Sequence, residues 1–305
     1  MAAAGLERFR LSGPAPHDLR DVFLIPDYVS EAEEASLTRQ IAASQQAWVQ
    51  LSGRRLQNHG GAVHSKGFLL PAPMPSWLAA LAGRVGGDVP PLAAAGGANH
   101  VLINAYRPGE GILPHSDGPL YAPVVSILSL GSPCVIRFWD KQEEAGTGGL
   151  PPRASVALPP RSLLVFAGDA YEKCLHGIEE VAAERLDSSV LNPGSCAVAA
   201  VPAAAAAAGS ARSGGGGGGS GGECCCTSGE GASPASAREG GAAAAAAGQQ
   251  PAAADDGGGA WREAAGAGGA GGGCELLLPR TAERFSLTIR RVLKVHKGLR
   301  LPGAR

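Results

Sequence analysis

The distribution of hydrophobic residues divides this chain near His100. Before that point, Asp21–Pro26 and Trp48–Leu51 are short apolar runs that predict strands. Ser30 and Glu33 have the spacing of a capping box and predict the start of a helix, and Pro75–Val85 predicts a second, shorter helix. The first third of the chain is therefore expected to mix helices with strands.

After His100 the pattern changes to short apolar runs separated by Gly and Pro. The predicted strands are Val101–Tyr106, Val124–Leu130, Val135–Trp139, Ala154–Leu158, Ser162–Phe166 and Arg284–Val295. Many short strands after a partly helical region are typical of an antiparallel sandwich or jelly roll with helices packed outside. The expected fold class is α+β, mainly β.

Composition shows that the chain does not fold uniformly. Of its 305 residues 46 are Gly, and 23 of these, with 24 Ala, lie among the 73 residues of Val201–Gly273. A segment without periodicity or charge order cannot build a core, so residues 201–273 are expected to be a disordered, low-complexity insertion. We predict an N-terminal extension (1–20), one domain formed by residues 21–200 and 274–296, and a tail (297–305).

Charge and cysteine content narrow the class of protein. The net charge of −1 gives no global basic field, so any nucleic-acid partner must use a local patch. No apolar run approaches the ~18 residues that span a bilayer, and the seven Cys have neither disulfide nor zinc spacing. We expect a monomer without membrane association, with reduced thiols, in the cytoplasm and nucleus.

Two predicted strands carry polar residues on one face. Period-two alternation places Asn104 and Tyr106 on the same face as Leu102. In the last strand, the residues that share one face are Arg284, Ser286, Thr288 and Arg290. A half-exposed strand with a solvated polar face is the simpler interpretation of either pattern taken alone.

Histidine and aspartate supply the candidate metal site. His115 and Asp117 are two residues apart, and a distant third ligand would complete the two-histidine, one-carboxylate set that holds non-haem Fe(II) with open positions. His176 is favoured because it ends a unit made of a strand at Leu163–Phe166, a turn at Gly168–Asp169 and a strand at Tyr171–His176. His100 is the alternative, with a surface or strand-end position as its simpler interpretation.

Open positions on iron require a co-substrate, for which 2-oxoglutarate is the natural candidate. Its distal carboxylate needs a guanidinium partner, because Arg binds a carboxylate in a planar, bidentate manner. Arg284 and Arg290 are six residues apart, about 20 Å along a strand at ~3.3 Å per residue. They are therefore expected to hold opposite ends of one diacid.

The order Asn104-x-Tyr106, His115-x-Asp117, His176 and Arg284-x5-Arg290 resembles the AlkB-like Fe(II)/2-oxoglutarate dioxygenases. The text NHVLINAYRPGEGILPHSDGPLY is similar to the AlkB homologue six group of that family. The resemblance implies a double-stranded β-helix with outer helices, and iron bound by His115, Asp117 and His176. It also implies that the distal carboxylate of 2-oxoglutarate is bound by Asn104, Tyr106 and Arg284, and that Arg290 approaches the keto-acid end.

The resemblance further implies oxidative demethylation of alkylated nucleobases in DNA or RNA. A basic segment between two glycines is the expected substrate lid, formed by Arg54, Arg55, Gln57, Asn58 and His59, with a solvated turn as the alternative. A basic patch near the C-terminus is suited to phosphate, with a solvated tail as the alternative; it contains Arg290, Arg291, Lys294, His296, Lys297 and Arg300. Two alternative functions stay open: the same chemistry on a protein or small molecule, and a non-catalytic jelly-roll binding module.

Overall fold

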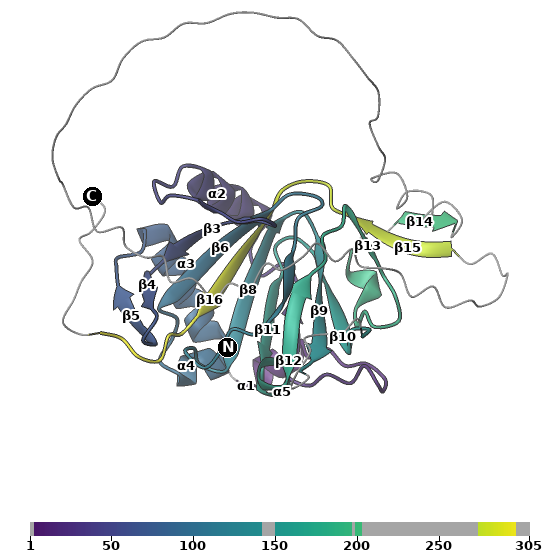
Figure 1. The fold of residues 1–305 in the computed structure, drawn as a ribbon, viewed down its shortest axis with the longest axis horizontal. Helices are drawn as coiled ribbons and strands as arrows, with labels where there is room; N and C mark the ends of the chain where they lie inside the picture. Colours follow the sequence, from purple (N-terminus) through teal and green to yellow (C-terminus); the bar gives the residue numbers. More distant parts are fainter. Residues whose placement is uncertain (1–2, 142–149, 197–198, 203–273, 297–305) are drawn as a thin grey trace, which may run out of the picture.

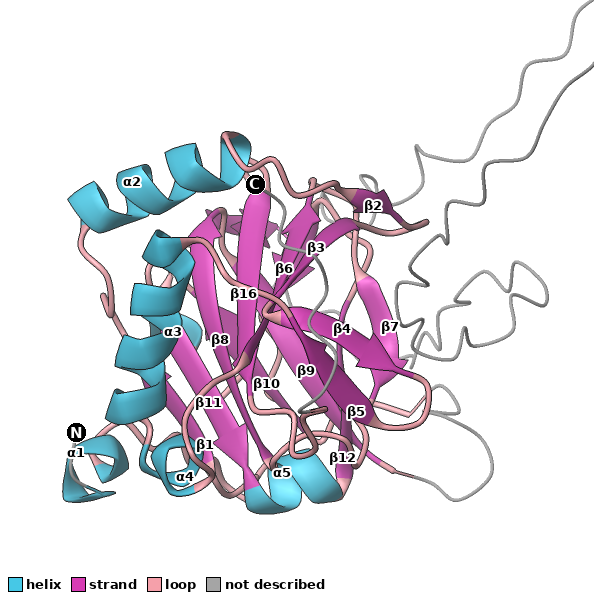
Figure 2. Cartoon of the chain, turned by 90° about the vertical axis from the view of Figure 1, so that its left-hand side faces the viewer, coloured by secondary structure: helices cyan, strands magenta, loops and turns pink. Residues whose placement is uncertain are grey.

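The computed structural model describes residues 3–141, 150–196, 199–202 and 274–296. Two antiparallel β-sheets face each other, and helices cover the outer face of the larger sheet (Figures 1 and 2). The expectation of a mainly β fold with outer helices is confirmed. In this described part, no helix has the length and apolar character needed to cross a membrane.

The larger sheet has seven strands in the order β1-β11-β8-β16-β6-β3-β2. The bounds are Val22–Ile25 (β1), Val49–Gln50 (β2), Arg55–His59 (β3), His100–Tyr106 (β6), Val124–Gly131 (β8), Leu163–Ala167 (β11) and Arg284–Arg290 (β16). β16 comes last in the chain but lies in the middle of the sheet, between β8 and β6. Its polar face is therefore at the centre of the molecule.

The smaller sheet has the order β10-β9-β12-β7. The bounds are Ile112–His115 (β7), Cys134–Asp140 (β9), Ala154–Leu158 (β10) and Cys174–Ile178 (β12). An apolar core between the sheets joins Val125 and Phe166 of the larger sheet to Ile136 and Phe138 of the smaller one. Along each strand every second side chain points inward, and these inward side chains hold the two sheets face to face.

The helices are Ala3–Glu7 (α1), Glu31–Ala42 (α2), Ser76–Asp88 (α3), Pro90–Ala94 (α4) and Gly168–Glu172 (α5), with a 3-10 turn at Pro193–Ser195. The predicted capping box is present: the Ser30 hydroxyl accepts from the Glu33 amide, and the Glu33 carboxylate accepts from the Ser30 amide. Ile41 of α2 and Leu78 of α3 are fully buried against the outer face of the larger sheet. This second core explains why that sheet is apolar on its outer side as well.

Two small sheets complete the fold. One is the hairpin of β4 (Gly61–His64) and β5 (Phe68–Pro71), and the other has the order β13-β15-β14, from Ala183–Arg185 (β13), Ala199–Pro202 (β14) and Cys274–Pro279 (β15). Pro202 and Cys274 are partners in the β14–β15 register. The chain therefore leaves and re-enters the described structure at neighbouring positions, and the expected insertion lies almost entirely outside the described residues.

Some sequence-based expectations were wrong in detail. The last strand ends at Arg290 rather than continuing to Val295, and Tyr171 lies in the short helix α5 rather than in a strand. The N-terminal extension also contributes to the cores, since Leu6 is 3% exposed and Leu19 is 1% exposed. Residues 3–20 therefore pack as part of the domain.

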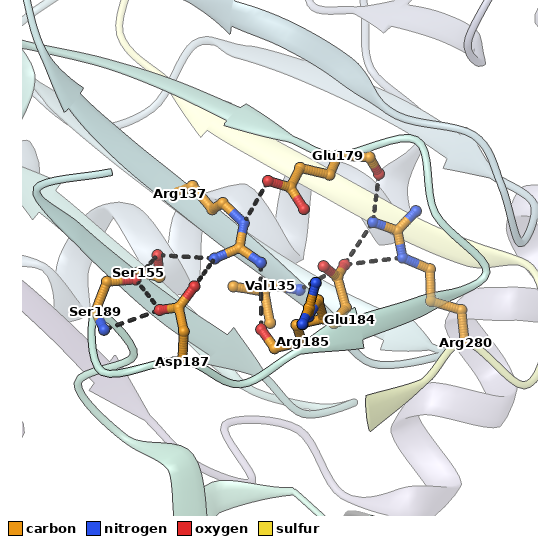
Figure 3. A network of polar contacts seen from close by, with 9 residues as sticks. All are labelled: Val135, Arg137, Ser155, Glu179, Glu184, Arg185, Asp187, Ser189 and Arg280. Atoms are coloured by element: carbon orange, nitrogen blue, oxygen red, sulfur yellow. Dashed lines mark hydrogen bonds and ion pairs between the residues drawn. The ribbon is translucent and has the colours of Figure 1, made fainter. Parts of the chain in front are cut away.

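A buried polar network lies beside the smaller sheet (Figure 3). Glu184 on β13 is fully buried, and its Oε1 accepts hydrogen bonds from the Arg280 side chain at 2.5 and 2.9 Å and from the Val135 amide at 3.0 Å. Nearby, the Arg137 guanidinium donates to the Arg185 carbonyl and forms an ion pair with Glu179. The network links the strands on either side of residues 203–273 to β9.

Candidate metal centre and co-substrate pocket

Three potential metal ligands meet between the two sheets. One ligand atom each from His115, Asp117 and His176 lies within 4.8 Å of the others. His115 ends β7 and is the register partner of His176 on β12, so the two imidazoles project side by side with ring centroids 4.4 Å apart. Asp117 follows two residues after His115, and its Oδ2 lies 3.8 Å from Nε2 of His176.

The electrostatics of this cluster favour metal binding. Burial lowers the pKa of His176 to about 3 and also lowers the pKa of His115, so both imidazoles are neutral near pH 7. Burial alone would raise the pKa of Asp117, but the adjacent Arg290 guanidinium holds that pKa below its usual range. The His115 Nδ1 lies 2.9 Å from the Leu113 carbonyl, which assigns the proton to Nδ1 and the lone pair to Nε2.

The polar faces of β6 and β16 line the same pocket as these three residues. Leu102, Asn104 and Tyr106 of β6 line it, as the alternation predicted. The residues of β16 that line it are Arg284, Ser286, Thr288 and Arg290. Neither strand has a solvated face, because the opposite residues, such as Ile103 and Leu287, are fully buried under the helices. The simpler interpretation of these strands as half exposed is therefore wrong.

The two arginines of β16 occupy different ends of the pocket. The Arg290 guanidinium donates to Oδ1 of Asp117 and lies 4.0 Å from the centre of the Tyr121 ring. The Arg284 guanidinium donates to the Ser129 hydroxyl at 3.0 Å and lies 5.7 Å from the centre of the Tyr106 ring. One arginine is thus beside the metal-ligand cluster and the other is remote from it.

The pocket contains buried polar atoms that fit both an iron ion and a dicarboxylate. Oδ2 of Asp117, and Nε and Nη1 of Arg284, are buried without a hydrogen-bond partner within the described residues. Buried polar atoms are nearly always satisfied in folded proteins, so these orphans indicate where a ligand completes the structure. A carboxylate oxygen between two neutral imidazoles suits a divalent cation, and unpaired guanidinium donors suit a carboxylate.

The remaining histidines lie elsewhere. His100 is the first residue of β6 and is 1% exposed, so its simpler interpretation as a strand-end residue is confirmed, whereas a surface position was wrong. Its ring is 5.9 Å from that of Tyr121, and neither ring nitrogen has a hydrogen-bond partner in the described structure. Nδ1 of His17 lies 2.7 Å from the Arg153 carbonyl, and His17 does not line the pocket. The structure therefore groups His176, and not His100, with His115 and Asp117.

Most of the segment expected to be the substrate lid forms a strand. Arg55–His59 is strand β3 of the larger sheet, paired along its length with β6. Gln57 is fully buried and donates to the Gln46 carbonyl, and His59 is 4% exposed and lies 3.3 Å from the Gln57 amide oxygen. Arg55 forms an ion pair with Glu283.

Two of the five lid residues lie toward the pocket side of the sheet. Arg54 lines the pocket itself. Asn58 is the register partner of Leu102 and therefore shares the pocket-facing side of the sheet, where it is half-buried. The predicted basic patch is only partly described: Arg291 donates to the carbonyl of Gly96, while Lys297 and Arg300 lie outside the described residues.

Sequence reasoning missed Ser129 and Tyr121, which contact the two pocket arginines. Ser129 lies in a strand that was predicted correctly, and alternation from Ile127 places it on the pocket-facing side. Its pairing with Ser286 of β16 joins positions far apart in the sequence and has no local signal. Tyr121 precedes that strand in an irregular segment, where no periodic pattern applies.

Comparison with known proteins agrees with this geometry. Residues 43–196 match the family model described as the 2OG-Fe(II) oxygenase superfamily. The chain is 40% identical over 182 residues to "Probable RNA/DNA demethylase ALKBH6" of Danio rerio, covering 57% of this chain and 76% of that protein. It is 27% identical over 201 residues to "Alkylated DNA repair protein ALKBH8 homolog" of Arabidopsis thaliana, covering 58% of this chain and 56% of that protein.

Among solved structures, that of OsALKBH1 matches with a TM-score of 0.40 and 13% identity, covering 54% of this chain and 89% of that one. The family model spans half of the chain, and the zebrafish relative is matched over three quarters of its own length. The resemblance to AlkB-like enzymes is thus confirmed. The chain belongs to the 2OG-Fe(II) oxygenase superfamily, whose enzymes use Fe(II), 2-oxoglutarate and O2.

Proposed function

We propose that this oxygenase removes methyl groups from alkylated nucleobases in DNA or RNA. The observation that carries the proposal is the meeting of His115, Asp117 and His176 in one pocket with the unpaired guanidinium donors of Arg284. The choice of substrate class is supported by the 40% identity to a relative named a probable RNA/DNA demethylase. A base must be single-stranded or flipped to reach a centre enclosed between two sheets.

In this proposal His115, Asp117 and His176 hold Fe(II). Iron supplies the oxidative chemistry when 2-oxoglutarate and O2 are bound. Overall, an N-methyl group, O2 and 2-oxoglutarate become an N–H group, formaldehyde, succinate and carbon dioxide. The protein contributes by keeping both imidazoles neutral and the carboxylate ionised, through burial and through the contact of Arg290 with Asp117.

The opposite end of the pocket is proposed to bind the distal carboxylate of 2-oxoglutarate. Arg284 offers Nε and Nη1, and Asn104 and Tyr106 lie on the neighbouring strand, where Tyr106 is the register partner of Arg284. Burial raises the pKa of Tyr106, which keeps its hydroxyl protonated and able to donate. Arg290 is proposed to approach the keto-acid end of the co-substrate, which its contact with Asp117 supports.

The overall fold and the domain organisation are also part of the proposal. We propose that the facing sheets form a double-stranded β-helix of the jelly-roll type, and that residues 203–273 interrupt a single dioxygenase domain. The matched register of Pro202 and Cys274 supports the second point. A monomeric state and a location in the cytoplasm and nucleus stay predictions.

The test is succinate and formaldehyde production by the full chain with Fe(II) and 2-oxoglutarate, with and without methylated oligonucleotides. We expect methylated single strands to stimulate both products. His115→Ala is expected to abolish turnover and Fe(II) binding, whereas His17→Ala, a histidine outside the pocket, is expected to preserve both. Turnover that is stimulated by a protein or small molecule, and by none of the oligonucleotides, would show that the enzyme acts on that other substrate class. No turnover at all, with iron binding unchanged in His115→Ala, would refute the proposal.

A further inference from the structure

We propose that Arg54 is a positioning residue of the co-substrate pocket, where it fixes the orientation of the Asn104 side-chain amide. The inference rests on the proposed function, since it takes the distal carboxylate of 2-oxoglutarate to bind beside Asn104. It assigns Arg54 a role distinct from that of a substrate lid.

The contact is direct and lies at the pocket. Nε of Arg54 donates to Oδ1 of Asn104 at 3.1 Å, and both residues line the pocket. Asn104 is 5% exposed, so its amide is shielded from water that would otherwise compete for Oδ1. Arg54 is half-buried and reaches Asn104 from outside the strand pair β6 and β16.

The contact determines the orientation of the Asn104 amide because the two ends of an amide group differ chemically. One end of the Asn side chain only accepts hydrogen bonds and the other end only donates. Arginine has donors and no acceptor, so Arg54 selects the orientation in which Oδ1 faces Arg54. The amide end that remains is the NH2 group, which is the donor a carboxylate requires. The flipped amide would instead turn an oxygen toward the carboxylate and repel it.

Arg54 is itself held in a fixed turn. The Leu51 amide donates to the Arg54 carbonyl at 2.8 Å, and the Gln50 side chain donates to the same carbonyl at 3.2 Å. A Cβ on Gly53 would lie 2.7 Å from the carbonyl oxygen of Gly111, closer than real Cβ atoms approach, so only glycine fits there. The backbone before Arg54 is therefore packed against the segment that leads into β7 and its His115.

The neighbouring arginine shows that the arrangement is specific to one position. The Arg55 Nη2 donates to both carboxylate oxygens of Glu283, at 2.9 and 3.0 Å, and its guanidinium lies 4.4 Å from the centre of the Trp48 ring. Arg55 is thus committed to a contact outside the pocket. Of this adjacent pair, Arg54 alone is a pocket-lining residue.

The experiment measures 2-oxoglutarate affinity by calorimetry on the full chain loaded with Fe(II) without oxygen, so that no turnover is needed. Loss of a hydrogen bond from a charged donor leads us to expect about tenfold weaker binding in Arg54→Gln. Arg54→Lys, which retains a charged donor and has no acceptor, is expected to recover part of the affinity that is lost in Arg54→Gln. Arg84→Gln is the matched control, because it removes the same charge from an ion pair with Glu33 outside the pocket.

A double-mutant cycle identifies the route of the effect. If Arg54 acts through Asn104, then Arg54→Gln has little further effect in an Asn104→Ala background, while Fe(II) affinity and the unfolding midpoint stay unchanged. Fully additive effects, or an Arg54→Gln affinity within twofold of the wild type, would overturn the inference. If Arg284→Ala loses 2-oxoglutarate while Arg54→Gln retains it, the inference alone fails. If neither variant changes the affinity, the assigned pocket fails as well.

Discussion

Arg280 provides the sharpest test of how the described segments before and after residues 203–273 are held together. Its Nε and Nη2 bind Oε1 of the fully buried Glu184, and its Nη2 also donates to the carbonyl of Glu179 (Figure 3). Its Nη1 donates to the carbonyl of Glu110. The Arg280→Met substitution retains much of the apolar volume but removes every one of these donors. Glu184 would then be a buried carboxylate that, among the described residues, keeps a single hydrogen bond, from the Val135 amide.

The expected loss of stability is large. Breaking a buried ion pair by removing one partner costs about 3–5 kcal/mol, because the other charge is left uncompensated. With a urea m-value of about 2–3 kcal/mol/M, a loss of ~4 kcal/mol lowers the unfolding midpoint by about 1.5 M. Replacing both partners, as in Glu184→Leu with Arg280→Met, removes both charges of the pair together. The double variant is therefore expected to lose at least 2 kcal/mol less than the sum of the two single losses.

The loss also depends on pH in a defined direction. Burial raises the pKa of Glu184 even with Arg280 present, and removal of Arg280 raises it further. A carboxyl group whose folded pKa exceeds its unfolded value stabilises the fold when protonated, and that stability is lost as pH rises through the folded pKa. The penalty of Arg280→Met is therefore expected to be larger at pH 8 than at pH 5.

Urea unfolding at both pH values, followed by circular dichroism, measures these quantities. The control is Arg153→Met, which removes a partly exposed arginine paired with Asp140 and is expected to cost less than about 1 kcal/mol. A midpoint shift below 0.5 M for Arg280→Met, equal at the two pH values, would refute the view that this pair is an electrostatic requirement of the fold.

Two further predictions concern the interruption and acid stability. Deleting Ala211–Gly272 is expected to leave the Fe(II) and 2-oxoglutarate affinities, measured by calorimetry, within about twofold of the wild-type values. The reason is that Pro202 and Cys274, on either side of residues 203–273, are partners in the β14–β15 register. Loss of both affinities in a folded variant would contradict this prediction. Burial lowers the pKa of His59 to about 4 in the folded protein. His59 is therefore protonated at a higher pH in the unfolded chain than in the folded one, and the free energy of unfolding falls as pH drops from about 6.5 toward 4. His59→Phe should reduce the urea-measured loss between pH 7 and pH 5 by about 2 kcal/mol, and an unchanged loss would show that His59 is not the titrating group.

Much of the pocket could be predicted because its strands alternate strictly. In β16 every second residue is polar, and in β6 the same alternation holds except at Leu102. A period of two fixes which side chains share a face whatever the strand pairs with. The pairing then placed Tyr106 opposite Arg284 and Asn104 opposite Ser286 on one surface. The His115-x-Asp117 spacing was informative for the same reason, since residues two apart in an extended segment point in the same direction.

The parts that could not be predicted depend on long-range contacts. β3 has the sequence RLQNH, with one apolar residue, and gives no hydrophobic signal. Gln57 and His59 are nevertheless buried, because the Gln57 amide binds the Gln46 carbonyl and the two side chains contact each other. Glu184 and Arg280 are 96 residues apart, and no local pattern links them. In each case a buried polar group is compatible with the fold only through a partner that the linear sequence does not reveal.

Residues 203–273 lie between His176 and Arg284 in the sequence, yet both residues line one pocket. The contacts of β15 explain how this is possible. β15 pairs with β13 on one edge and β14 on the other, and its Leu278 is 1% exposed in a cluster with Val135 and Ala157 of the smaller sheet. Lengthening a 4-residue turn to the length of 203–273 is roughly four doublings, which costs about 2.5 kcal/mol of closure entropy. Burying one leucine stabilises by about 1.5–3 kcal/mol, so Leu278 alone is comparable with that cost. The position of Arg284 in the pocket is therefore determined by the anchoring of β15 and depends only weakly on the length of the segment before it.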